Sequence, residues 1–213
     1  GKYGYQKIIG AFEAREIDIL VGTQMLSKGL DFDNVSLVGI LNADMMLNFP
    51  DFRAHERAFQ LMVQVSGRAG RSKKQGKVLI QTYNPYHQIL QQVSSTDYAA
   101  MYKEQLEDRW QYHYPPYYRL VKITLKHKDY QKVDAGIIWL SKALQNVFRE
   151  HVLGPSEPAV SRIRNQYIKN VMIKIPPKQS LGKTKQEIDK IKNTFQAIAD
   201  FRPIRFIIDV DAY

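Results

Sequence analysis

Two short segments of the chain combine residue types that suit phosphate chemistry. The first, residues 22–32 (GTQMLSKGLDF), directly follows an apolar run that is typical of a β-strand. Gly22 and Gly29 allow the backbone to turn tightly and to approach a ligand, and Thr23 and Gln24 offer hydroxyl and amide groups. Open α/β sheets usually bind ligands at the carboxyl ends of their strands, so the segment is a candidate binding loop. An ordinary turn after a strand is the alternative.

The second segment, residues 64–71 (QVSGRAGR), displays two arginines with small residues between them. Arg68 and Arg71 are three positions apart, so at the end of a helix they would share a face. Planar, permanently charged guanidinium groups suit a transferring phosphoryl group, whose negative charge lies on its equatorial oxygens. The alternative is a solvated basic helix terminus that interacts with the helix dipole.

The elements around these segments alternate between helix and strand up to about residue 114. The sequence predicts helices at residues 5–16, 51–69 and 97–110, and strands at residues 17–22, 35–41 and 77–81. The strands are short and apolar, which favours a parallel sheet with helices on both faces.

The pattern changes at Pro115 and Pro116, which end the preceding helix because proline lacks an amide donor. Beyond them the sequence predicts strands at residues 119–126, within 154–163, at 167–175 and at 205–210, and helices at 131–150 and 184–200. This β-α-β-β-α-β order indicates a small antiparallel or mixed sheet with two helices on one face. We therefore expect an α/β domain at residues 1–114 and an α+β domain at residues 115–213.

The composition favours a polyanionic partner. The formal charge is +10 and the pI is about 9.6, an excess that is most often matched by nucleic acid, although a solvated basic surface would also account for it. The sequence has no cysteine, which excludes disulfides and cysteine-based zinc sites within it. The histidines are scattered, so we expect no metal site, and no apolar run is long enough to span a bilayer.

Taken together, the two segments resemble motifs five and six of superfamily-two helicases. Residues 19–85 are more specifically similar to the family of the primosomal helicase PriA, through residues 22–32, 42–71 (NADMMLNFPDFRAHERAFQLMVQVSGRAGR) and 76–85 (GKVLIQTYNP). Residues 114–117 (YPPY), 153–155 (LGP) and 209–211 (DVD) resemble the C-terminal domain of that family. Asn42 and Ser66 depart from the pattern, since the family suggests Asp and Ala there.

The resemblance implies the second, RecA-like motor lobe of an ATP-dependent 3′-to-5′ DNA helicase, incomplete at its N-terminus. Arg68 and Arg71 would reach the γ-phosphate of ATP, one as an arginine finger, and Gln64 would sense the nucleotide. Gly29 and Asp31 would lie near its ribose. No phosphate-loop pattern occurs in the chain, so we expect ATP and Mg²⁺ to be held mainly by a first lobe, and this segment to be inactive alone.

The same resemblance assigns DNA contacts, partners and location. Thr23, Gln24 and Lys28 would contact the phosphate backbone of the tracked strand. The family's zinc module would lie upstream of this segment. The expected setting is the cytoplasm, close to the nucleoid, with a monomer that binds forked or single-stranded DNA and other primosome proteins and initiates primosome assembly at stalled forks.

Residues 162–192 carry many basic residues and few acidic ones. The candidate DNA contacts in this run are Arg162, Arg164, Lys169, Lys178, Lys183 and Lys185. Nearby tyrosines suit base stacking. A basic pocket could equally take the acidic C-terminal tail of single-stranded DNA-binding protein. The simpler alternatives are a solvated helix face for the lysines and core or linker packing for the tyrosines. A non-enzymatic DNA-binding module also remains open.

Overall fold

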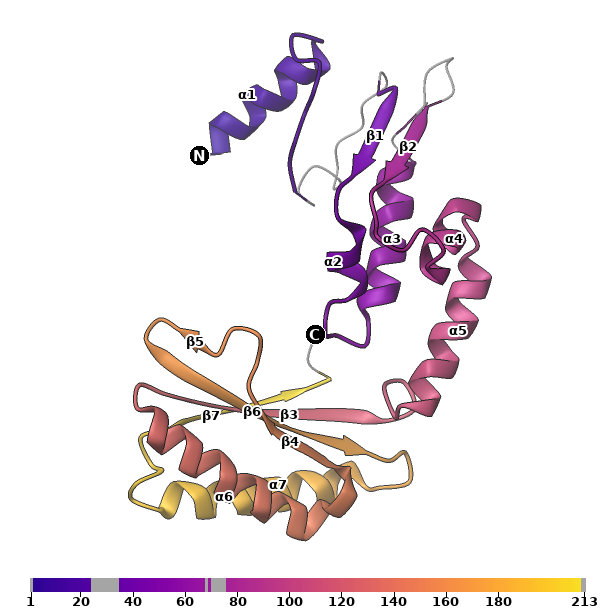
Figure 1. Ribbon diagram of the computed structural model, residues 1–213. Coiled ribbons are helices and arrows are strands. Elements are labelled where there is room, and N and C mark those ends of the chain that lie inside the picture. Colours follow the sequence, from indigo (N-terminus) through magenta and orange to yellow (C-terminus); the bar gives the residue numbers. More distant parts are fainter. Residues whose placement is uncertain (1, 24–34, 68, 70–75, 212–213) are drawn as a thin grey trace. The chain divides into compact units, whose positions relative to one another are not determined.

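The computed structural model describes residues 2–23, 35–67, 69 and 76–211, and the chain divides into two compact units at residues 1–106 and 107–213 (Figure 1). The division falls inside helix α5 (Tyr98–Gln111), shortly before the double proline at residues 115–116. Each unit has its own hydrophobic core, so the two are described separately.

The first unit contains a small parallel sheet, as the sequence predicted. Its elements are α1 (Lys2–Glu13), β1 (Leu37–Ile40), α2 (Ala43–Leu47), α3 (Ala54–Ser66), β2 (Lys77–Ile80), α4 (Gln88–Ser95) and most of α5. Strands β1 and β2 pair in parallel, with Leu37 opposite Lys77. The core lies among α2, α3, α4 and α5, where Phe59, Met62 and Met101 are almost fully buried.

The strand predicted at residues 17–22 is wrong, because the structure has no strand in this segment. Ile19 and Val21 are 78% and 81% exposed. An apolar run forms a buried strand only when a neighbouring strand satisfies its backbone groups, and the strands described in the first unit pair only with each other. Helices α2 and α4 were not predicted. The apolar spacing of Ile89, Leu90 and Val93 in α4 is the signal that could have found it.

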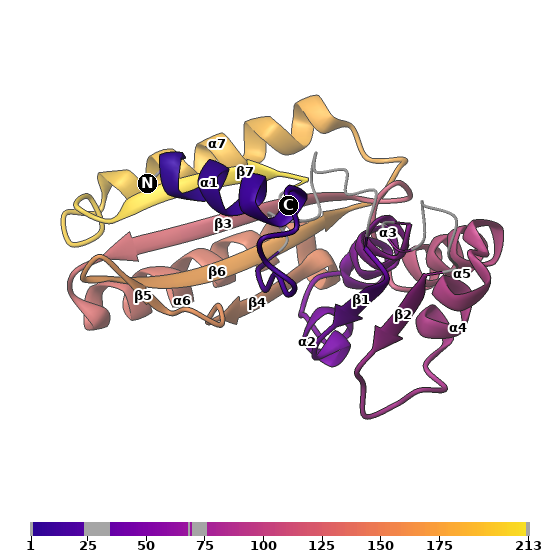
Figure 2. The same cartoon turned by 90° about the horizontal axis from the view of Figure 1, so that it is seen from above.

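The second unit has the predicted β-α-β-β-α-β order, with one extra short strand. Its elements are β3 (Arg119–His127), α6 (Tyr130–Phe148), a 3₁₀ turn (Arg149–His151), β4 (Val152–Ser156), β5 (Arg162–Ile163), β6 (Gln166–Ile175), α7 (Leu181–Ala197) and β7 (Arg205–Val210). Among the described residues of this unit, all strand pairings are antiparallel. The sheet order is β4-β6-β3-β7 and β5 pairs with β6 (Figure 2). This is the strand order of a ferredoxin-like fold.

Both helices of the second unit cover the same face of its sheet, as expected (Figure 1). Alternate residues of β3, such as Val121, Ile123 and Leu125, enter the core with the apolar faces of α6 and α7. Gly136 in α6 allows a close approach here, since a Cβ atom at this position would lie 2.9 Å from Cδ1 of Ile204. Lys122 and Lys126 alternate with the core residues and lie half-buried on the opposite face of the sheet, the open face, which α6 and α7 do not cover. Thr124, between them, is buried and donates its hydroxyl to Oδ1 of Asn170.

Candidate nucleic-acid interface

Most residues predicted to contact the nucleotide lie outside the described part of the chain. These are Arg68, Arg71, Gly29 and Asp31, together with the predicted DNA contacts Gln24 and Lys28. Thr23 and Gln64 are described, and both are exposed. Helix α3 ends at Ser66, and the backbone N–H of Gly67 donates to the carbonyl of Val63 at 3.0 Å. The helix therefore presents Gln64 in its last turn, immediately before the arginine segment.

Polar residues at the carboxyl edge of the parallel sheet bond to each other. Asp44, at the start of α2, accepts hydrogen bonds from Oγ1 of Thr82 (2.9 Å) and from the backbone N–H of Tyr83 (3.0 Å). The bond from the Tyr83 backbone is the main cause of a lowered pKa of the Asp44 carboxyl. Asn42, with a left-handed φ of 52°, donates its backbone N–H to Oε1 of Gln81. These bonds tie together the two chain segments that leave β1 and β2.

Asp51 has a comparable local role at the start of α3. One carboxylate oxygen accepts from the backbone N–H of Arg53 (2.8 Å) and the other from the guanidinium of Arg57 (2.8 Å). The segment at residues 50–57, which resembles helicases, thus includes residues that stabilise the start of α3. The arginine segment at residues 68–71 follows the other end of that helix in the sequence.

The basic run of the second unit is divided between two ends of the sheet. Arg162 and Arg164 belong to the hairpin that joins β5 to β6, at the end of the sheet where β3 ends and β7 begins. Lys178, Lys183 and Lys185 follow the far end of β6, where α7 begins. All five side chains are exposed. The sequence analysis therefore treated residues 162–192 as one basic surface, whereas the fold divides them into two.

The β5–β6 hairpin presents its arginines on a short, defined turn. Ile163 pairs with Gln166, so the loop consists of Arg164 and Asn165, with φ angles of 48° and 60°. Two positive φ angles in a two-residue loop define a type I′ turn, which favours Asn or Gly and rarely contains Arg. Arg162 lies over the ring of Tyr167 at 4.9 Å and bonds to Asn165. The hairpin thus projects Arg164 at its tip and holds Arg162 beside it.

The open face of the sheet adds basic residues that the sequence analysis did not single out. Lys126 on β3 lies directly opposite Arg205 on β7, and like charges in this position repel. Neither side chain has an acidic partner among the described residues. Lys122, nearer the middle of β3, lies opposite Asp209. Lys122 and Lys126 could have been found from the sequence, because polar and apolar residues alternate along residues 119–127 and this alternation assigns each side chain to one face of the strand.

Lys169 has an internal role, whereas the sequence predicted a DNA contact. Its side chain is only 12% exposed, and its ammonium group bonds to Asp134 (2.5 Å), Glu157 (3.3 Å) and the hydroxyl of Tyr130 (3.2 Å). Burial alone would lower the pKa of Lys169, but the hydrogen bonds that its ammonium group donates to Asp134, Tyr130 and Glu157 outweigh it and raise the pKa. Because three acceptors match the three N–H donors, we do not retain Lys169 as a DNA contact.

Two of the tyrosines around the double proline, Tyr114 and Tyr118, are engaged in packing, whereas the side chain of Tyr112 is 58% exposed. Lys174 on β6 donates to the backbone carbonyl of Tyr112 (2.6 Å) and lies 3.8 Å from the centre of the Tyr114 ring. Burial lowers the pKa of Lys174. The ring of Tyr118 stacks on His113 at 4.4 Å. These contacts fasten the segment after α5 to the sheet, in agreement with the packing alternative stated for the tyrosines.

Within the described ranges, no group of three or more His, Asp or Glu side chains is arranged to hold a metal ion. In the same part of the chain, no helix is both long and apolar enough to cross a membrane.

Comparison with known proteins identifies relatives of both units. Residues 4–73 match the family described as "Helicase conserved C-terminal domain", and residues 111–213 match "Primosomal protein N C-terminal domain". Over 100% of its length the chain is 38% identical to "Replication restart protein PriA" of Bacillus subtilis, and it covers 26% of that protein. The proteins of the same name from Synechocystis and Borreliella burgdorferi are 37% and 34% identical over 82% and 93% of the chain, which covers 21% and 31% of them. The chain thus spans about a quarter of the length of these relatives.

Proposed function

Because the chain belongs to the PriA family of replication restart proteins, we propose that it forms the C-terminal part of an ATP-dependent DNA helicase. The whole protein would bind stalled or branched replication forks in the cytoplasm and initiate primosome assembly there. The observation that supports this function best is the order of domains: a helicase C-terminal region at residues 4–73 is followed by the family's own C-terminal domain at residues 111–213.

The first unit would supply one wall of a nucleotide site whose other wall, with Mg²⁺, belongs to a first motor lobe. Arg68 and Arg71 would neutralise negative charge on the γ-phosphate as it is transferred, a contribution of roughly 10³–10⁵ in rate for an arginine finger. Gln64, in the last turn of α3, would orient the attacking water. Gly29 and Asp31 would contact the ribose. ATP supplies the free energy for opening and closing the two lobes.

Along the DNA, the proposed direction of movement is 3′ to 5′. Thr23, Gln24 and Lys28 would hold the phosphates of the tracked strand through hydroxyl, amide and ammonium groups, which position a strand without reading its sequence.

The second unit would hold the fork through the β5–β6 hairpin and the neighbouring open face of the sheet. Lys126 and Arg205 lie side by side on the open face, at the end of the sheet where the β5–β6 hairpin carries Arg162 and Arg164. A two-stranded hairpin also has the dimensions that a DNA major groove accepts. Lys178, Lys183 and Lys185 form a second contact region at the other end. This region could instead bind the acidic tail of single-stranded DNA-binding protein, which offers carboxylates in place of phosphates.

A direct test measures DNA-stimulated ATP hydrolysis by the full-length, monomeric protein, including its upstream zinc module. Arg68→Ala and Arg71→Ala should each lower the turnover rate by at least about 10³-fold while DNA binding is largely retained. Lys103→Ala, a charge loss at an exposed position of α5, is the control and should hydrolyse ATP normally. If both arginine variants hydrolyse ATP normally and instead lose DNA affinity, the chain is part of a non-enzymatic DNA-binding protein.

A further inference from the structure

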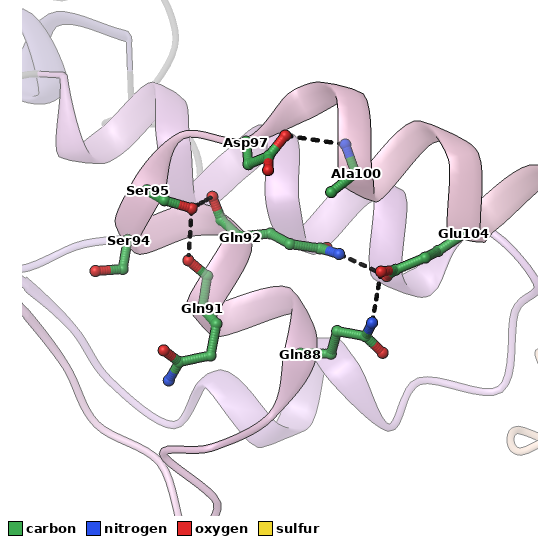
Figure 3. A pocket seen from close by; sticks show the side chains of 8 residues that line it. All are labelled: Gln88, Gln91, Gln92, Ser94, Ser95, Asp97, Ala100 and Glu104. Atoms are coloured by element: carbon green, nitrogen blue, oxygen red, sulfur yellow. Dashed lines mark hydrogen bonds between the residues drawn. The ribbon is translucent and has the colours of Figure 1, made fainter.

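The polar hollow between α4 and α5 of the first unit is lined by residues that bond mainly to each other (Figure 3). Nε2 of Gln88 and Nε2 of Gln92 both donate to the carboxylate of Glu104. Oδ1 of Asp97 accepts from the backbone N–H of Ala100. These bonds hold the two helices together and account for the polar character of the hollow. The second unit, by contrast, leaves a strand edge open.

Strand β7 forms this open edge, with β3 as its paired neighbour in the described structure (Figure 2). The opposite edge of the sheet is blunted at β4. There Pro155 has no N–H to donate, and the register with β6 shifts between Leu153 and Ser156. The six residues of β7 contain no proline and keep one register with β3 throughout. The β7 edge is therefore suited to accept a further strand.

The backbone of β7 offers three residues to such a strand. The N–H of Asp211 donates to the carbonyl of Leu120, which determines how the β3–β7 ladder alternates. Every second residue of an antiparallel strand bonds to its neighbour, so Phe206, Ile208 and Val210 direct their N–H and C=O groups to the free side. In the described part of the chain, no strand pairs with that side.

The side chains of β7 are complementary to those of a second β7. Arg205, Ile207 and Asp209 lie on the open face of the sheet, with the two charges placed symmetrically about Ile207. Among the described residues, neither Arg205 nor Asp209 forms an ion pair. When two such strands run antiparallel with Ile207 opposite Ile207, each Arg205 faces an Asp209. A parallel arrangement in the same register would instead bring like charges together.

The same register suits the backbone. With Ile207 at the centre, each Phe206 lies opposite an Ile208, and both residues direct their N–H and C=O groups to the free side. Two residues of this kind exchange a pair of hydrogen bonds, so the two symmetric pairs form four. Charge, backbone and apolar residues therefore favour one and the same alignment.

We propose that two copies of this chain pair through β7 in this antiparallel register, about a two-fold axis beside Ile207. Both copies then use the same surface, and their two sheets continue into one. Two strands of six residues bury much less than the about 1,200 Å² of a stable complex, so single chains prevail in dilute solution. Two copies on neighbouring stretches of one DNA molecule reach the local concentration that the contact needs.

Disulfide trapping tests the pairing, because the sequence has no cysteine and Ile207→Cys places a single thiol on the proposed axis. In a pair without direct backbone bonds the two Cα atoms lie about 4.5 Å apart, within the disulfide range of about 4.4–6.8 Å. Diamide oxidises the two thiols and takes up their hydrogens, so it should link two full chains, as measured on non-reducing gels.

Leu153→Cys is the matched control for the thiol. It lies on the same face of the sheet at the β4 edge, and its side chain is 45% exposed. Random collisions would link this variant at least as fast as Ile207→Cys. We expect it to link about tenfold more slowly, since the pairing raises the effective concentration of the thiols at residue 207 alone.

Charge exchange tests the register. In the Ile207→Cys chain, Arg205→Asp leaves acids at both paired positions and Asp209→Arg leaves bases, so each variant alone should link about tenfold more slowly. An equal mixture should link at the rate of the parent, as heterodimers identified by mass, because acids then face bases. The same two substitutions in the Leu153→Cys chain control for general attraction between the chains, and mixing them should not accelerate linking.

Equal linking rates of Ile207→Cys and Leu153→Cys would overturn the pairing, and this result is expected if the β7 edge receives a strand of another protein. A mixture that links no faster than its two components would overturn it as well. Arg205 is also a proposed DNA contact, so all rates are measured without DNA. The pairing goes beyond the proposed helicase function, and its failure would leave that function untouched.

Discussion

The carboxylate of Asp211 accepts a hydrogen bond from the backbone N–H of Leu120 at 3.0 Å, and the backbone N–H of Asp211 donates to the carbonyl of Leu120 at 2.7 Å. The second carboxylate oxygen of Asp211 accepts from the guanidinium of Arg119 at 3.1 Å. The residue after β7 is therefore fastened to the start of β3, at the point where the second unit begins its sheet. This is the structural role of the last aspartate in the segment at residues 209–211.

We predict that Asp211→Ala lowers the free energy of unfolding of the second unit by about 1–2 kcal/mol, because it leaves the partly buried N–H of Leu120 without its acceptor. Hydrogen exchange of the core amides of Ile123 and Leu125 measures this free energy within the intact chain. Asp209→Ala is the control, since Asp209 is exposed and should change stability by less than about 0.5 kcal/mol. Equal effects of the two substitutions would contradict the assigned role.

Arg164 provides a substitution that separates DNA binding from folding. Arg164→Asn removes the charge at the hairpin tip and places a residue there that prefers the positive φ angle of 48°. We expect unchanged or slightly higher stability, weaker binding of forked DNA, and a salt dependence of log K that is shallower by about one phosphate contact. Fluorescence anisotropy at several salt concentrations measures both quantities.

Lys142→Asn is the matched control for the hairpin variant. It makes the same change in net charge at an exposed position of α6, on the face of the sheet opposite to Lys126 and Arg205. If Lys142→Asn weakens binding as much as Arg164→Asn does, the overall charge determines the affinity and the hairpin is not a contact.

Lys169→Met should have the reverse pattern. It leaves Asp134 and Glu157 close together without the ammonium group that bonds to both, so we expect the second unit to lose about 1–3 kcal/mol of stability while affinity for DNA stays unchanged. Urea unfolding and anisotropy under identical buffer conditions measure the two effects. Loss of DNA affinity by a variant that remains folded would restore Lys169 as a DNA contact.

His87 makes the first unit sensitive to mild acid. Its Nδ1 atom accepts from the backbone N–H of Ile89 and caps α4, and burial together with the nearby His55 lowers the pKa of His87 below 6.5. The unfolded chain then takes up this proton at a higher pH than the folded chain. The stabilisation is therefore complete above pH 6.5 and is lost as the pH falls from there through the lowered pKa.

The variant His87→Asn tests this dependence, because an asparagine caps the helix and does not titrate. Near pH 7 the unfolding free energies of the two proteins should agree within about 0.5 kcal/mol. At pH 5.5 the variant should be the more stable one, as monitored by hydrogen exchange in α4. His151→Asn, in the second unit, should show no such crossover.

The second unit was predictable because each of its elements carries its own pattern. The alternation of residues 121–126 in β3 and the helical spacing of α6 both indicate which side chains face the core, and the order of the elements then defines the sheet. The apolar run at residues 17–22 has an equally good pattern, but a strand also needs a neighbour to pair with, and a pattern within one segment does not show whether a neighbour exists.

The candidate interface was less predictable for a related reason. Counting charges along residues 162–192 treats Lys169 and Arg164 alike, although one is enclosed by carboxylates and the other projects from a turn. Lys126 and Arg205 are distant in sequence and meet only because β3 and β7 are neighbours. Such differences arise from tertiary pairing, so they became visible only in the structure.

The length of β6 also determines the distance between the two basic regions of the second unit. Its ten residues separate the hairpin arginines from Lys178 by about 33 Å at the usual rise of a β-strand, and one turn of B-form DNA measures about 34 Å. A duplex lying along this strand would offer the same groove, on the same side, to both ends of the sheet. If the two contact points on the DNA are moved apart by about half a helical turn, they therefore no longer face the same side of the protein. The binding would then depend on their spacing, although the protein contacts no base.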